Sequence, residues 1–81
     1  MLRDREYELF KRYEKGEILS KEDENRVYNF ALIGLANIGV SKLEGELRET
    51  AILTPLGLNI FKREKIMRNP LKKFLYQLVN I

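Results

Sequence analysis

The stretch that decides the fold covers residues 27–57 and reads VYNFALIGLANIGV (27–40), SKLEGELRETAIL (41–53) and TPLG (54–57). Its first part is almost entirely apolar, its second part has a glycine in the middle, and its third part places a threonine before a proline. These signals predict a helix, then a β-hairpin, then the start of another helix. The rest of the chain supports this stretch or extends from it.

The apolar run predicts a helix that begins near Ser20 and ends at Gly39. Ser20 followed by Asp23 resembles a helix N-cap, and the acidic residues 22–24 complement the positive end of the helix dipole. The apolar arc of this helix is wide, so we expect it to be largely buried, either inside the domain or against another subunit. Gly34 in its middle either permits close approach of a neighbouring helix or costs about 1 kcal/mol of helix stability.

The hairpin and the second helix follow from turn and cap residues. Residues 40–44 and 48–53 can pair as two strands, because Gly45 supplies the positive φ that a tight turn needs. Thr54-Pro55 is a strong helix start, since the hydroxyl can cap and proline has no donor to lose. Asn69-Pro70 repeats this signal, which predicts a break between helices 55–68 and 70–80. One kinked helix over residues 55–80 is the alternative.

The first part of the chain predicts a helix over residues 4–15, which Gly16 ends, and then a connector over residues 17–19. The fold class is therefore mainly α with one β-hairpin (α+β), in the order α-α-β-β-α-α. We expect residues 1–81 to form a single domain. Because a core of this size leaves only a few kcal/mol of net stability, a partner subunit would help to stabilise it.

The composition excludes several functions. The chain has no cysteine and no histidine, so it lacks disulfides, thiolate metal ligands and the commonest general base. Ser20 and Ser41 have no histidine to activate them, and no glycine pattern fits a phosphate-binding loop. We therefore predict no enzymatic activity, no cofactor and no metal site. Abundant Glu, Lys and Arg without Cys is also typical of thermophile proteins.

The ends and apolar runs indicate where the protein is expected to be. The first 26 residues alternate both signs of charge and lack the basic start and apolar block of a signal peptide. No apolar run approaches the roughly 18 residues that span a bilayer. The prediction is a cytoplasmic protein without a membrane partner.

Positive charge is concentrated at the C-terminal end. Residues 1–26 hold seven basic and eight acidic side chains, residues 27–53 hold two and three, and residues 54–81 hold six and one. A concentrated basic patch can neutralise several phosphates and release their counterions, although such a run is also often only a solvated face. The six basic residues of the last segment are Lys62, Arg63, Lys65, Arg68, Lys72 and Lys73.

Residues 27–62 resemble the second half of a winged-helix domain, as found in small archaeal and bacterial regulators. The residues that carry this resemblance are Leu32, Leu35, Ile38-Gly39-Val40, the hairpin centred on Gly45, and Leu53-Thr54-Pro55-Leu56-Gly57. The resemblance implies a helix in the major groove, a wing on the DNA backbone and a dimer helix after the wing. It also implies a truncated helix-turn-helix, unless residues 4–15 supply the first helix.

Carried over by position, the helix ending at Ile38 would be the recognition helix, with Arg26, Asn29 and Asn37 facing outward. Lys42 and Arg48 would then lie on the wing. The same outward residues are also what the solvated side of any amphipathic helix presents. The acidic start of this helix would repel phosphates, which moves the expected DNA contacts toward the basic segment after the wing.

Two functions remain. The first is a small DNA-binding protein, a transcription regulator or nucleoid-associated factor, that binds duplex DNA as a homodimer. The second is a non-enzymatic protein-interaction or assembly module with a winged-helix-like fold that does not bind DNA. The helix over residues 69–81 is the expected dimerisation element, because a chain of 81 residues has few places to cover both its apolar side and that of residues 27–38. Packing of the same side in the core is the alternative. That side consists of Leu71, Phe74, Leu75, Leu78 and Val79.

Overall fold

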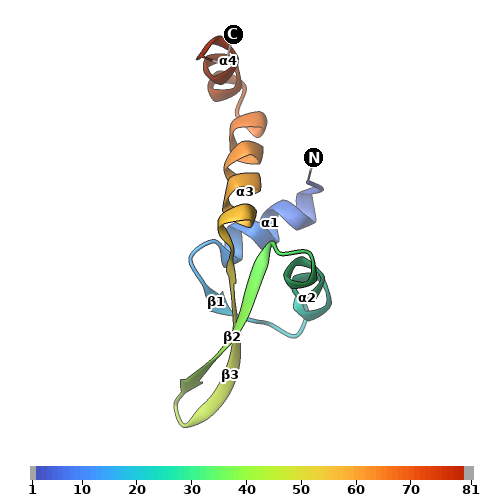
Figure 1. Ribbon diagram of the computed structural model, residues 1–81, viewed down its shortest axis with the longest axis vertical. Coiled ribbons are helices and arrows are strands. Elements are labelled where there is room, and N and C mark those ends of the chain that lie inside the picture. Colours follow the sequence, from blue (N-terminus) through green and yellow to red (C-terminus); the bar gives the residue numbers. More distant parts are fainter. Residues whose placement is uncertain (1, 80–81) are drawn as a thin grey trace.

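The computed structural model describes residues 2–79, apart from the side chains of residues 70–73 and 76. Within this range the chain forms an α+β fold with four helices and a three-stranded antiparallel sheet in the order β1-β3-β2 (Figure 1). The elements are α1 (Asp4–Tyr13), β1 (Glu17–Ile18), α2 (Glu24–Leu32), β2 (Ala36–Leu43), β3 (Glu46–Leu53), α3 (Pro55–Arg68) and α4 (Pro70–Val79). The α+β class is confirmed. The expected element order lacked β1.

Strand β1 replaces most of the predicted connector. Glu17 pairs with Ala51 and Ile18 pairs with Thr50, so that β1 lies at the edge of the sheet beside β3. The N–H of Leu19 also donates to the carbonyl of Glu49, at 2.9 Å. A two-residue strand has no periodicity of its own, which is why the sequence predicted a hairpin and not a three-stranded sheet. Helix α1 ends at Tyr13, two residues before the predicted end, and Gly16, at φ 91°, lies in the turn that follows.

The predicted helix over residues 20–39 is wrong at its C-terminal end. Helix α2 stops at Leu32 because Gly34 adopts a left-handed φ of 82°. The N–H of Leu35 donates to the carbonyl of Phe30 at 2.8 Å, and the N–H of Gly34 donates to that of Ala31 at 3.1 Å. These two bonds form a Schellman motif, in which glycine is favoured because it carries no Cβ. Gly34 is thus a helix terminator.

The N-terminal end of α2 also differs from the expectation. The carbonyl of Ser20 accepts a hydrogen bond from the N–H of Asp23 at 3.1 Å, in a turn that precedes the helix. The helix begins at Glu24, and the Asp23 carboxylate makes no cap hydrogen bond because it bonds to α1 instead. Residues 20–23 therefore lead into the helix and are not part of it.

Strands β2 and β3 form a longer hairpin than predicted. Their register runs from Ala36 opposite Leu53 to Leu43 opposite Glu46, which leaves a two-residue turn. Glu44 and Gly45 in this turn have φ values of 51° and 82°. Two positive φ values match the turn type whose twist suits a hairpin. The positive φ expected at Gly45 is confirmed, and the hairpin extends well beyond the helices (Figure 1).

The core lies where α1, α2 and the start of α3 cover the base of the sheet. Phe10 is fully buried, and its ring meets that of Phe30 edge-on with centroids 4.9 Å apart. Phe61 of α3 closes the other side, with its centroid 6.5 Å from that of Phe10. The buried cluster consists of Leu9, Phe10, Tyr13, Leu19, Val27, Phe30, Leu35, Ala36, Ala51, Leu53 and Phe61.

Thr54 joins α3 to the connection between α2 and β2. Its Oγ1 accepts a hydrogen bond from the N–H of Gly57 at 3.1 Å and donates one to the carbonyl of Gly34 at 2.6 Å. Its own N–H donates to the carbonyl of Leu35 at 3.0 Å. A Cβ at Gly57 would lie 2.1 Å from the Leu35 oxygen, so only glycine lets the two backbones approach this closely. The predicted Thr54 cap is confirmed.

The predicted break between the last two helices is also confirmed. Asn69 is extended, with φ −104° and ψ 110°, so α3 ends at Arg68 and α4 starts at Pro70. The molecule is long and narrow, at 52 × 19 × 19 Å, with the hairpin at one end and α4 at the other (Figure 1). None of the described helices is long and apolar enough to cross a membrane.

Candidate nucleic-acid interface

The structure divides the predicted basic segment into exposed and internally bonded residues. Lys62 and Arg63 are exposed on α3 and make no hydrogen bond or ion pair within the described part of the chain. Lys65 is partly engaged: its Nζ lies 3.7 Å from the carboxylate of Glu14 and 4.5 Å from the ring centroid of Phe61. The side chains of Lys72 and Lys73 lie outside the described residues.

The guanidinium of Arg68 uses its donors in hydrogen bonds within the protein. It donates to Asp4 Oδ1 at 2.9 Å, to the carbonyl of Leu2 at 2.9 Å and to Glu64 Oε2 at 3.2 Å. It also stacks on Tyr7, 4.1 Å from the ring centroid. The hydrogen bond to Asp4 raises the pKa of Arg68 above its usual value. Arg68 therefore ties α3 to the segment before α1.

Glu64 completes this tie from the same face of α3. The residue is only 7% exposed, and its Oε1 accepts a hydrogen bond from the N–H of Leu2 at 3.2 Å. Two residues of α3 thus bond the backbone of Leu2: Glu64 accepts from its N–H, and Arg68 donates to its carbonyl. We call this pair of residues the Leu2 clasp.

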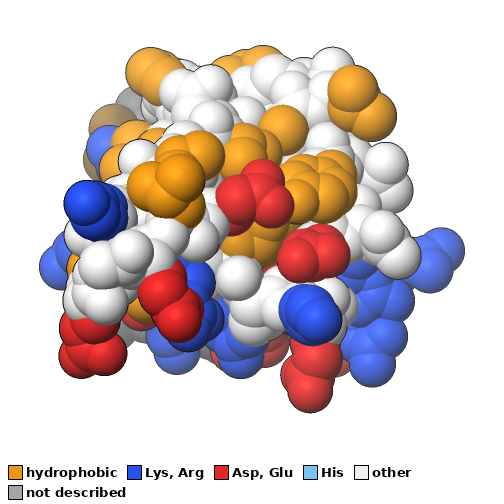
Figure 2. Space-filling model, turned by 90° about the horizontal axis from the view of Figure 1, so that it is seen from below, with side chains coloured by type: hydrophobic (Ala, Val, Ile, Leu, Met, Phe, Trp, Pro, Cys, Tyr) orange, Lys and Arg blue, Asp and Glu red, His pale blue; other side chains and the backbone are white. Residues whose placement is uncertain are grey.

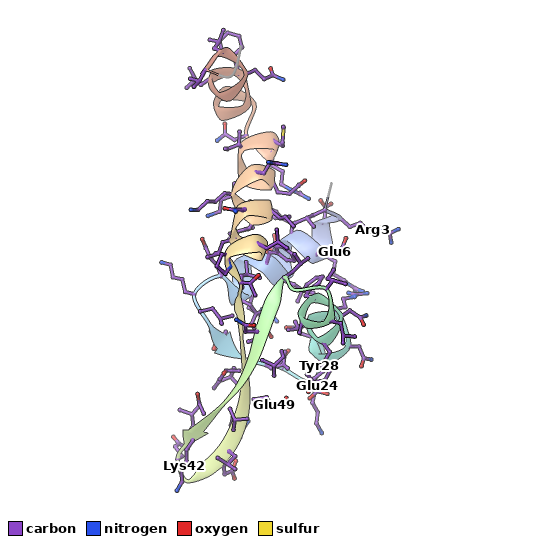
Figure 3. The ribbon with its side chains drawn as sticks, viewed as in Figure 1. Arg3, Glu6, Glu24, Tyr28, Lys42 and Glu49 are labelled. Carbon is purple, nitrogen blue, oxygen red and sulfur yellow. The ribbon has the colours of Figure 1, made fainter. Side chains whose placement is uncertain are left out.

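The two predicted wing residues do not form one basic surface. Lys42 lies opposite Leu47 and Arg48 lies opposite Ser41, so the two basic side chains project from opposite faces of the hairpin. Arg48 pairs with Glu46 at 3.2 Å. Lys42 is exposed near the tip of the hairpin (Figure 3).

Arg26 and Asn29 are exposed on α2, and they line a groove between α1 and α2. Arg3, Arg5, Glu6 and Phe30 complete its lining. We call this feature the arginine groove. Sequence reasoning missed Arg3 and Arg5, because they stand in a segment of alternating charge where neither sign dominates. Only the packing of α1 on α2 places them beside Arg26.

Asn37 is not on a helix, contrary to the expectation. It is exposed on β2, opposite Ile52. The helix that was expected to carry Arg26, Asn29 and Asn37 together ends at Leu32. Asn37 is therefore separated from the other two by the turn at Gly34.

Tyr28 links α2 to the hairpin. Its hydroxyl donates to Glu49 Oε1 at 2.6 Å, and Glu24 lies nearby on the same helix (Figure 3). This hydrogen bond, with some desolvation, raises the pKa of Tyr28 to about 12. The phenol is therefore protonated at neutral pH and acts as a fixed donor between the two elements.

Asp23 links α2 to α1 in a second hollow, which adjoins the arginine groove at Arg5 and Arg26. Its Oδ2 accepts hydrogen bonds from Tyr13 at 2.8 Å and from Arg12 at 2.6 Å. Desolvation raises the pKa of Asp23, but the hydrogen bonds from Tyr13 and Arg12 outweigh it and hold the pKa below 3.8. Arg12 is thereby committed to an internal contact.

The charged and apolar side chains are partly separated when the molecule is viewed from the hairpin end. Figure 2 shows the molecule from the hairpin end, with most hydrophobic side chains in the upper half of the view and most charged ones in the lower half, and with acidic side chains beside hydrophobic ones in the middle. Large apolar side chains are also exposed on α4, where Phe74, Leu75, Leu78 and Val79 are 52–85% exposed. The side chain of Leu71, the fifth predicted interface residue, lies outside the described residues.

The predicted contact residues thus occupy three separate surfaces: α3, the hairpin and the arginine groove. Among the described residues, no three Cys, His, Asp or Glu side chains lie close enough together to hold a metal ion. The chain matches no protein-family model, and neither the curated proteins nor the solved structures contain a significant match to it.

Proposed function

We propose that this chain is a small, non-enzymatic DNA-binding protein of winged-helix-like architecture, acting as a transcription regulator or nucleoid-associated factor. One observation carries the proposal. Lys62, Arg63, Arg26 and Lys42 are exposed, and within the described residues none of them has an ion-pair partner. Basic side chains without an internal partner are free to neutralise phosphates, which supplies most of the affinity of a protein for duplex DNA.

The arrangement of elements supports the same proposal. Helix α2 is followed directly by a hairpin that extends past the core, and Tyr28 holds the two in a fixed relation through Glu49. A winged-helix-like protein needs such a helix and hairpin in one rigid unit, so that both reach the duplex together.

The surface area supports a homodimer. The chain exposes 6346 Å², whereas a folded monomer of its mass is expected to expose about 5,100 Å². The radius of gyration is 14.8 Å, against about 12 Å expected for a compact chain of this length. The excess of about 1,200 Å² exceeds the roughly 800 Å² that each partner buries in a standard interface. A second copy packed on α4 would cover part of this excess.

Fluorescence anisotropy with a labelled duplex at several salt concentrations tests the proposal. We expect affinity to fall steeply with salt, with a slope near −0.9 for each phosphate contacted. Lys62→Glu/Arg63→Glu should weaken binding and reduce the slope by about 2. The matched control is Lys11→Glu/Lys15→Glu, which makes the same charge change at exposed residues on and just after α1.

A parent protein that binds no duplex at low salt would rule out the DNA-binding function. That result would favour a protein-interaction or assembly module, for which the hairpin offers a specific observation. Val40 and Leu47 are 64% and 74% exposed on the hairpin, and apolar side chains in such a position are suited to contact another protein.

A further inference from the structure

We propose that the arginine groove is a binding site for the phosphodiester backbone of duplex DNA, with Arg3, Arg5 and Arg26 as the phosphate-contacting residues. This inference rests on the proposed function and gives it a defined contact surface. The sequence predicted DNA contacts on α2 at Arg26 and Asn29 only. The groove adds Arg5 of α1 and Arg3, the N-cap of α1.

The walls of the groove are held at a fixed separation. The edge-on contact between Phe10 and Phe30 sets how closely α1 approaches α2, and Phe30, at 8% exposed, lies at the groove floor. In the adjoining hollow, Asp23 receives hydrogen bonds from Arg12 and Tyr13 of α1. The side chains on the two helices therefore face one another across a preformed gap, which lowers the ordering cost of binding.

The charge in the groove is unbalanced at one end. Within the described residues, the guanidinium groups of Arg3, Arg5 and Arg26 have no carboxylate partner. Glu6 is the one carboxylate in the lining at this end, and its Oε1 accepts a hydrogen bond from the N–H of Arg3 at 3.1 Å. Three guanidinium groups against one carboxylate leave a net positive site.

A second hollow adjoins the groove at Arg5 and Arg26, and its other lining residues are net negative. Past Arg5 and Arg26 its lining contains Arg12 together with Glu8, Glu22 and Asp23. These are one basic and three acidic side chains, and Arg12 is already paired with Asp23. An anionic backbone would consequently bind at the Arg3 end and leave the groove before Glu22.

The Leu2 clasp fixes the residue that precedes Arg3. The N–H of Leu2 is held by Glu64 and its carbonyl by Arg68, both on α3. Arg3 is extended, with φ −71° and ψ 158°, and its side chain reaches outward at the start of α1 (Figure 3). Glu64 and Arg68 are thus positioning residues, which act on the groove through Leu2.

The donors in the groove match phosphate chemistry. Guanidinium presents a planar fork of N–H donors that bonds phosphate oxygens in pairs, and it stays charged at any physiological pH. Asn29, exposed between Arg26 and the end of α2, can add amide hydrogen bonds to phosphate or sugar. Three guanidinium groups spread over two helices suit a run of successive phosphates better than a single small anion.

The test compares Arg5→Gln/Arg26→Gln with Lys11→Gln/Lys15→Gln, using the anisotropy titration with the same duplex. Both variants lose two positive charges, but only the first changes the groove. We expect the groove variant to lower the magnitude of the salt slope by about 2 and the control to leave it unchanged. Between 50 and 200 mM salt, the groove variant should accordingly lose about tenfold less affinity than the parent.

Thermal unfolding of each variant checks that it folds. If Arg5→Gln/Arg26→Gln unfolds, Arg3→Gln serves in its place, because Arg3 precedes the body of α1, and its slope change should be about 1. Equal slopes for parent, groove variant and control would overturn the groove while leaving DNA binding intact. A parent that binds no duplex would overturn the proposed function and the groove together.

Discussion

Arg68 stands in the predicted phosphate-binding run, yet its donors go to groups of its own chain. Its partners Asp4 and Leu2 lie 64 and 66 positions away in the sequence. No local pattern relates residues so distant. A charge count therefore places Arg68 in the basic patch, although its guanidinium is already hydrogen-bonded to Asp4, Leu2 and Glu64. Lys62 and Arg63, a few residues earlier, remain available.

Gly57 carries a steric prediction at the same scale. In Gly57→Ala the new methyl group would fall 2.1 Å from the Leu35 carbonyl oxygen, which already accepts a hydrogen bond from Thr54. The start of α3 would have to move away from the sheet. We expect a loss of about 2 kcal/mol of unfolding free energy, within the range typical of overpacking.

Urea unfolding of both proteins measures this loss. Asn59→Ala is the control, since Asn59 is exposed two residues further along α3 and should change stability by less than about 0.5 kcal/mol. If Gly57→Ala is as stable as the parent, the close approach of α3 to Leu35 is not a constraint on the fold.

At the scale of elements, residues with a fixed backbone preference marked three boundaries correctly, whereas apolar periodicity did not give the type of every element. The Thr54 cap, the turn at Gly45 and the break at Asn69 each depend on one or two residues with a fixed backbone preference, and all three are present. The apolar run at residues 35–40 fits either a helix or a buried strand, and periodicity alone does not decide between them. The left-handed φ at Gly34 decides it.

Part of the candidate site was predictable for the same reason. Arg26 and Asn29 are exposed on α2, as the helical pattern indicated. Arg3 and Arg5 were not recognised, because they join the site only through the packing of Phe10 on Phe30. Tertiary contacts between residues 20 positions apart leave no signature in one sequence.

The contact between α1 and α2 predicts a pH dependence. The folded-state pKa of Asp23 is lowered below 3.8, so the contribution of Asp23 to stability is fully present above that pH. It is lost as pH falls below 3.8 through the folded-state pKa. Asp23→Asn should be less stable than the parent by about 1–3 kcal/mol at pH 7, since it weakens the hydrogen bonds to Arg12 and Tyr13.

Urea unfolding from pH 7 to pH 2 would show the two curves converging below pH 3.8. Glu22→Gln, an exposed neighbour, is the control and should track the parent throughout. A constant gap between Asp23→Asn and the parent down to pH 2 would mean that the Asp23 charge does not stabilise the contact.

At the scale of the whole molecule, the exposed area and the elongated shape predict association. Sedimentation equilibrium at tens of micromolar should give the mass of a dimer. Leu78→Glu should shift it to a monomer, because Leu78 is 54% exposed on α4 and a carboxylate there would oppose burial in an interface.

The comparison variant is Gln77→Glu, which adds the same charge at an exposed position next to Leu78. We expect this variant to remain dimeric. A parent chain that sediments as a monomer would exclude α4 as a dimerisation element at that concentration, whatever the variants do.

The hydrogen bonds of Thr54 have a consequence for a dimer that binds DNA as proposed above. Because Thr54 bonds to Gly34, Leu35 and Gly57, helix α3 cannot swivel independently of α2 and the hairpin. The direction of α4 is then set at one residue, Asn69, where the backbone turns between the helices. In a two-fold dimer built on α4, the dihedral angles of Asn69 would fix the distance between the two arginine grooves. The backbone conformation of this one residue would therefore set how far apart two DNA segments lie when one dimer binds both.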